Sequence, residues 1–150
     1  MALKHTDFMK TIAGRIGQHL KPPLDDFRLG ETRWLCQVYF GRERRVHYEV
    51  SRPWSRSGRQ IEIGLHFETR DKAHNRALVA AFDRYLMEIQ VGLGTDVKAE
   101  VWDKGWAKVY QIFPDSDLTD SLAAKTTQQL ATFITVLQPI YQTIEQDIER

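Results

Sequence analysis

Two segments near the middle of the chain alternate apolar and polar residues, and this alternation constrains the fold more than any other feature. In residues 46–50 and 60–68, every second residue is aliphatic or aromatic. Successive side chains of a β-strand point to opposite faces, so both segments are predicted strands with one apolar face. The predicted inward-facing side chains are Val46, Tyr48, Val50, Ile61, Ile63, Leu65 and Phe67.

Three further strands and three helices are predicted around this pair. The strands are expected at residues 33–40, 97–102 and 107–113, and the helices at 6–20, 71–91 and from 119 onward. Pro139 should kink or split the last helix. Strands joined by short turns pair antiparallel. The sequence therefore predicts an α+β fold in the order α-β-β-β-α-β-β-α, with a mostly antiparallel five-stranded sheet and helices packed on one face.

Length and composition indicate one ordinary globular domain, residues 1–150. The formal net charge is +1, so any binding of polyanions must come from a local patch. A single cysteine, Cys36, excludes an internal disulfide. The first residues lack the apolar stretch of a secretory signal, and no segment approaches the roughly 20 apolar residues of a membrane span. We therefore expect a cytoplasmic protein that does not bind membranes.

The polar face of the two central strands gathers histidines and carboxylates. These residues are His47, Glu49, Glu62, His66 and Glu68. Imidazole and carboxylate groups together suit a divalent metal such as zinc, manganese or magnesium, which could activate water for hydrolysis. The same spacing is also what any solvated sheet face produces. Apart from such an ion, no cofactor is expected.

A basic segment surrounds the predicted strand at residues 46–50. Six arginines stand against two glutamates in residues 42–59, with one tryptophan among them. Arginine matches phosphate geometry and an exposed tryptophan stacks on bases, so this segment is a candidate nucleic-acid surface. The alternative is a solubilising rim paired with the acidic C-terminal region. The candidate nucleic-acid-binding residues are Arg42, Arg44, Arg45, Arg52, Trp54, Arg56 and Arg59.

The predicted element order resembles two known architectures. One is the type III secretion chaperone, a cytoplasmic α+β module that binds extended peptides. The other is the restriction-endonuclease-like fold of the PD-(D/E)XK nucleases. Those nucleases place an acid on the second core strand, then an acid and a lysine two residues apart on the third. Glu49 and Glu62 match the acids, whereas Gly64 stands at the lysine position, so Lys98 or Lys108 would have to supply the amine.

Three functions follow from these patterns, and the sequence does not decide whether the protein is an enzyme. The first is a non-catalytic protein-binding or adaptor module, which would use a strand edge or the rim around Trp54 and Trp102. The alternative is a nucleic-acid-binding or nuclease-like protein, and the third is a metal-dependent hydrolase. The apolar stripe of the last helix fits a monomer core and also a homodimer, in which the part beyond Pro139 packs on a second copy.

Overall fold

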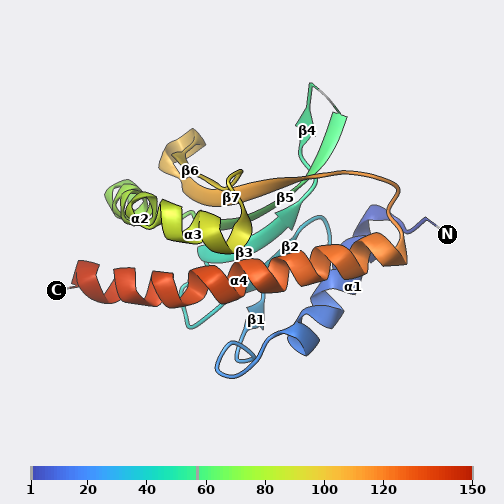
Figure 1. The fold of residues 1–150 in the computed structure, drawn as a ribbon, viewed down its shortest axis with the longest axis horizontal. Helices are drawn as coiled ribbons and strands as arrows, with labels where there is room; N and C mark the ends of the chain where they lie inside the picture. The colour runs from blue at the N-terminus through green and yellow to red at the C-terminus, as the bar shows by residue number, and fades with distance from the viewer. Residues whose placement is uncertain (1, 57, 150) are drawn as a thin grey trace.

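The computed structural model describes residues 2–56 and 58–149 and contains four α-helices over a β-sheet (Figure 1). The helices are α1 (His5–Arg15), α2 (Lys72–Arg84), α3 (Leu86–Leu93) and α4 (Asp120–Glu149), with 3-10 turns at Ile16–His19 and Asp103–Gly105. The strands are β1 (Arg28–Leu29), β2 (Cys36–Tyr39), β3 (Val46–Ser51), β4 (Trp54–Ser55), β5 (Gly58–Phe67), β6 (Lys98–Val101) and β7 (Ala107–Pro114).

The sheet confirms the α+β class but has more strands than expected. Six strands lie side by side in the order β1-β2-β3-β5-β7-β6, and each neighbouring pair is antiparallel. The two-residue β4 pairs only with the start of β5. The expected count of five was wrong because β1 is two residues long. A strand this short has no alternation to detect and is defined only by its pairing with β2.

The helices pack on the face that the alternation predicts to be apolar. The Phe82 ring of α2 lies 5.5 Å from the Phe67 ring of β5, and the Phe133 ring of α4 lies 6.3 Å from the Tyr48 ring of β3. Both contacts are on the same side of the sheet, and α4 runs along much of its length (Figure 1). All seven predicted inward-facing side chains of β3 and β5 are buried, as expected. The core therefore lies between this face and the helices.

The segment expected to form one helix over residues 71–91 forms two. Asp71 caps α2 by accepting a hydrogen bond from the His74 amide, as its side chain predicts. At Tyr85 the backbone leaves helical geometry, with ψ of 4°, and α3 begins at the next residue. The Tyr85 amide bonds to the Phe82 carbonyl, which tightens the end of α2. No glycine or proline marks this break in the sequence.

Helix α4 continues through Pro139 instead of splitting there. Side chains on both sides of the proline, including Leu137 and Ile144, are buried within the single chain, so tertiary packing outweighs the lost hydrogen bond. The apolar stripe is therefore used inside the monomer, and the homodimer stays a prediction. Among the described residues, no helix is both long enough and apolar enough to cross a bilayer.

Candidate metal centre

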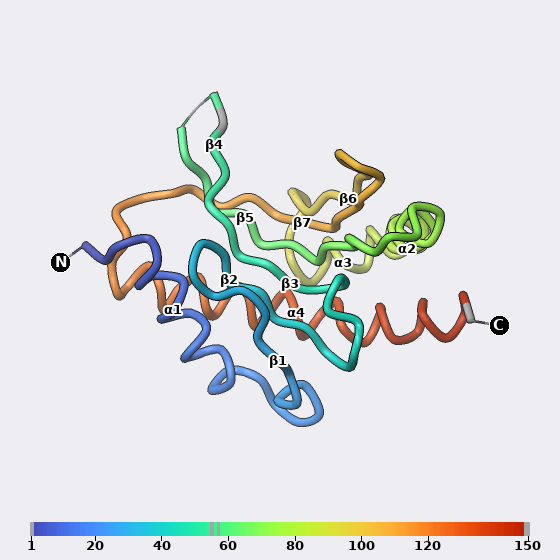
Figure 2. The backbone as a smooth tube through the Cα atoms, turned by 180° about the vertical axis from the view of Figure 1, so that it is seen from behind, coloured from blue at the N-terminus to red at the C-terminus, as the bar shows by residue number. Residues whose placement is uncertain are grey.

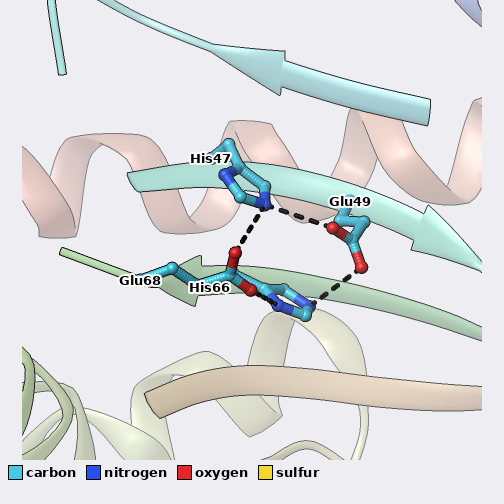
Figure 3. A group of neighbouring side chains, drawn as sticks. All are labelled: His47, Glu49, His66 and Glu68. Atoms are coloured by element: carbon cyan, nitrogen blue, oxygen red, sulfur yellow. Dashed lines mark hydrogen bonds and ion pairs between the residues drawn. The ribbon is translucent and has the colours of Figure 1, made fainter. Parts of the chain in front are cut away.

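The polar face of β3 and β5 is buried rather than solvated. His47 pairs across the strands with His66, and Glu49 pairs with Gly64. Their exposed fractions are 4% for His47, 8% for Glu49 and 3% for His66. These side chains therefore do not form the solvated sheet face that was the alternative to a metal site. Figure 3 shows them with Glu68, which follows directly after β5, all directed toward one another.

The contacts of His47 determine which of its nitrogens faces the cluster. Its Nδ1 lies 3.1 Å from the Arg44 carbonyl oxygen, which only accepts hydrogen bonds, so Nδ1 carries a proton. Its Nε2 lies 3.2 Å from Glu49 Oε1 and 3.9 Å from Glu68 Oε1. Burial alone would lower the pKa of His47, but the hydrogen bond to Glu49 and the nearby carboxylates raise it above 6.5. Because the ionised Glu49 carboxylate only accepts hydrogen bonds, Nε2 donates a second ring proton to it, and a metal ion at Nε2 would displace that proton.

His66 repeats this arrangement from the neighbouring strand. Its Nδ1 lies 3.0 Å from Glu68 Oε2 and donates a hydrogen bond to that carboxylate oxygen. Its Nε2 has no hydrogen-bond partner although the atom is buried. The nearest carboxylate oxygens, Glu49 Oε2 and Glu62 Oε2, are each 3.7 Å from Nε2, too far for a good hydrogen bond. A buried polar atom without a partner is costly, so this nitrogen is poised for a ligand.

Glu49 lies between the two imidazole rings and is held ionised. Burial alone would raise the pKa of Glu49, whereas the His47 hydrogen bond, the nearby His66 and the Gln37 amide together lower it to about 2. Gln37 Nε2, from β2, donates to Glu49 Oε1 at 3.1 Å. One carboxylate oxygen therefore faces His47 and the other faces His66. This geometry places a negative charge beside the Nε2 atoms of both rings.

Gly64 keeps space open beside the orphaned nitrogen. A β-carbon placed on Gly64 would lie 3.2 Å from His66 Nε2, 3.1 Å from Tyr110 Cβ and 3.2 Å from the Val109 carbonyl oxygen. Each distance is tighter than ordinary van der Waals contact. A side chain larger than that of glycine at this position would therefore make its neighbours shift by a few tenths of an ångström.

Of the five predicted metal ligands, four come together and the fifth bonds elsewhere. His47, Glu49, His66 and Glu68 offer ligand atoms within 4.8 Å of one another. The carboxylate of Glu62 instead accepts two hydrogen bonds from the Lys108 amine, at 3.1 and 3.2 Å. Lys108, from the neighbouring strand β7, therefore neutralises the charge of Glu62.

Residues from distant parts of the chain line the rest of the cluster. The Trp102 ring packs edge-on against His66 with centroids 6.1 Å apart, and the Lys108 amine lies 5.1 Å from the centroid of Trp102. Sequence reasoning named Trp102 only as part of a possible binding rim and did not include Gln37 or Gly64 in the site. In β2, Gln37 lies between the buried residues Cys36 and Val38, so its side chain points to the opposite face of the sheet. This alternation was the one sequence signal for including Gln37 in the site.

The predicted nucleic-acid residues do not form one continuous surface. Arg42, Arg44 and Arg45 stand in the turn before β3, whereas Trp54, Arg56 and Arg59 belong to the hairpin after β3. The two groups are therefore at opposite ends of one strand. Arg52 is engaged in an ion pair with Asp115 at 2.6 Å, and both side chains are only 12% exposed. Arg52 therefore supports the base of the hairpin.

Comparison with known proteins does not place this chain in a family. No family model matches it. No curated protein and no solved structure matches it either. The resemblances to chaperones and nucleases stay predictions, as does the expected cytoplasmic location.

Proposed function

We propose that this protein binds one divalent transition-metal ion, such as Zn²⁺, through His47, Glu49 and His66. The observation that carries the proposal is the buried Nε2 of His66, which has no hydrogen-bond partner while its Nδ1 is bonded to Glu68. Metal-binding histidines typically donate the proton of the second ring nitrogen to a carboxylate or a backbone carbonyl. His66 has the first kind of partner and His47 has the second.

The donor atoms favour a borderline transition metal over magnesium or calcium. Two imidazole nitrogens and a carboxylate suit zinc and its first-row neighbours, whereas Mg²⁺ and Ca²⁺ prefer oxygen ligands only. Glu68 would act as a positioning residue that orients the His66 ring. Three protein ligands would leave one position for water, and a bound zinc ion lowers the pKa of such a water.

The origin of the ligands supports a stabilising role for the ion. His47 and Glu49 belong to β3, and His66 belongs to β5, the strand beside it in the sheet. One ion would therefore cross-link two central strands. Binding only to the folded state stabilises that state by mass action. The burial of all three side chains supports this role more than the binding of a large substrate.

Protein binding, the function that the sequence favoured, stays a prediction with weaker support. Large apolar side chains are exposed on several different elements. They are Leu29, Trp34, Trp54, Met87, Val91, Val101 and Ile148. The metal proposal rests on a specific arrangement of atoms, so it is the function that the geometry supports best.

The test is a metal titration of the chelator-stripped full chain by calorimetry, with Zn²⁺ as the ligand and Mg²⁺ as the comparison ion. We expect one zinc per chain and no measurable heat from magnesium. His66→Gln and Glu49→Gln should remove zinc binding, whereas His19→Gln, at an exposed histidine, should not change it. Absence of zinc binding, or equal binding by H66Q and the unaltered chain, would show that the cluster is a metal-free His–Glu network.

A further inference from the structure

The β4–β5 hairpin projects from the body of the protein (Figures 1 and 2). Trp54 is 72% exposed, and the guanidinium carbon of Arg59 lies 4.9 Å from the centroid of its ring. Arg56, at the turn, is also exposed. From residue 50 to residue 61 the chain contains three arginines and no acidic residue. Arg52 is paired with Asp115, so the hairpin combines one aromatic surface with the positive charges of Arg56 and Arg59.

A second tryptophan with an arginine over its ring lies at the base of this hairpin. Trp34 is 58% exposed, and the guanidinium carbon of Arg33 lies 5.7 Å from its ring centroid. Trp34 precedes β2, whose Cys36 pairs with Val50 of β3, so it lies near the end of β3 from which the hairpin leaves. His5 joins the two regions, since it contacts the Trp34 ring at 5.6 Å and lies 3.4 Å from Arg52 Nη1.

The base of the hairpin is rigidly connected to the body. Arg52 and Asp115 form two hydrogen bonds, at 2.6 and 3.3 Å, between β3 and the segment after β7. The Glu31 carboxylate, the acidic group nearest to Trp34 in the sequence, accepts hydrogen bonds from the backbone amides of Trp34 and Leu35. The negative charge of Glu31 is therefore engaged in these two local hydrogen bonds. These contacts hold the backbone on which both tryptophans stand to the body of the protein.

We infer that this end of the protein binds single-stranded nucleic acid. The binding surface, called here the Trp–Arg surface, consists of Arg33, Trp34, Trp54, Arg56 and Arg59. Bases would stack on the two tryptophan rings, and the guanidinium groups would contact phosphates. Single strands fit better than duplex because stacking on an exposed ring requires unpaired bases. A protein partner fits less well, because Trp54 is flanked by arginine, proline and serine rather than by a contiguous apolar patch.

This inference is independent of the metal proposal. The Trp–Arg surface lies at the end of β3 where Ser51 leads into the hairpin, whereas His47 stands near the other end of that strand. Failure of zinc binding would therefore leave the surface unaffected. Likewise, a variant that still binds zinc but no longer binds nucleic acid would bear only on the inference about the Trp–Arg surface.

The test measures binding of the full chain to fluorescent oligo-dT and oligo-U of about 12 nucleotides by anisotropy. Trp54→Ala should weaken binding about 5- to 100-fold, and Trp54→Phe should restore part of the affinity because phenylalanine still stacks. Arg56→Ala combined with Arg59→Ala should also reduce the slope of log K against log salt by about 1.4, since each phosphate contact on a single strand contributes about 0.7. Melting curves would check that these exposed substitutions leave the fold intact.

The matched control removes two arginines from the other end of β3, as Arg42→Ala with Arg45→Ala. This variant changes the net charge by the same amount and should lose less affinity than the hairpin variant. The inference is wrong if no oligonucleotide binds at about 50 mM salt. It is equally wrong if W54A binds like the unaltered chain, if both arginine pairs matter equally, or if duplex DNA binds as tightly as the single strand.

Discussion

Glu68 Oε2 lies 3.0 Å from His66 Nδ1, and this contact determines which nitrogen of the buried ring is available to a ligand. The carboxylate accepts a hydrogen bond from Nδ1–H, so Nε2 of His66 is left unprotonated and without a partner. The Arg44 carbonyl oxygen likewise accepts a hydrogen bond from Nδ1 of His47. Two rings from neighbouring strands therefore present the same atom to Glu49.

Glu68→Gln should weaken zinc binding about 10- to 100-fold without abolishing it. A glutamine can still accept from His66 Nδ1, but it lacks the charge that makes the imidazole a stronger ligand. Calorimetry of E68Q beside E49Q checks this difference. Glu100→Gln is the control, because Glu100 bonds to the Tyr110 hydroxyl at 2.9 Å and lies outside the cluster. If E68Q loses all binding, Glu68 is a ligand and not a positioning residue.

Zinc should raise the melting temperature of the chelator-stripped protein. With free zinc at about 100 times its dissociation constant, the free energy of unfolding rises by about 2.7 kcal/mol. For a chain of this size, that corresponds to an increase on the order of 5–10 °C. Differential scanning calorimetry with and without zinc measures the shift. H66Q should show no increase, and an equal increase in H66Q would mean that zinc binds elsewhere.

Gly64→Ala should destabilise the protein and reduce zinc affinity together. The new β-carbon would press on His66 Nε2 and on the Val109 carbonyl, and overpacking of this kind typically costs about 1–3 kcal/mol. Urea unfolding and a zinc titration give the two readouts. Gly14→Ala is the matched control, because nothing lies within 4 Å of a β-carbon there, and alanine suits the α1 helix. A neutral G64A would contradict the crowding described for the cluster.

The sequence predicted which side chains share a face, because the period of a strand is a local property. The shared face of His47, Glu49 and His66 was predicted from that period alone. Their burial could not be predicted, because the residues that cover them, Gln37, Trp102 and Lys108, come from segments far away in the chain. Gly64 looked like the loss of a catalytic lysine, and only the approach of Tyr110 from β7 reveals why glycine stands there. The break at Tyr85 has no glycine or proline to mark it, so it could not be predicted.

Cys36 should be unreactive in the folded protein and should destabilise it at alkaline pH. Burial, with smaller contributions from Glu31 and Glu49, raises the pKa of the Cys36 thiol from 9.0 to about 12. The unfolded chain therefore loses the thiol proton from pH 9 upward while the folded chain retains it. The stability associated with this group is present below pH 9 and decreases as pH rises toward 12, by at most about 1.4 kcal/mol per pH unit.

Two measurements on Cys36 check these expectations. Ellman's reagent at pH 8 should label the urea-unfolded chain rapidly and the native chain only at the rate of unfolding, because thiolate is the reactive form. Urea unfolding from pH 8 to pH 10 should show a steeper loss of stability in the unaltered chain than in Cys36→Ala, which has no thiol to ionise. Rapid native labelling would place the thiol at the surface, and identical pH dependence in C36A would assign the alkaline loss to other groups.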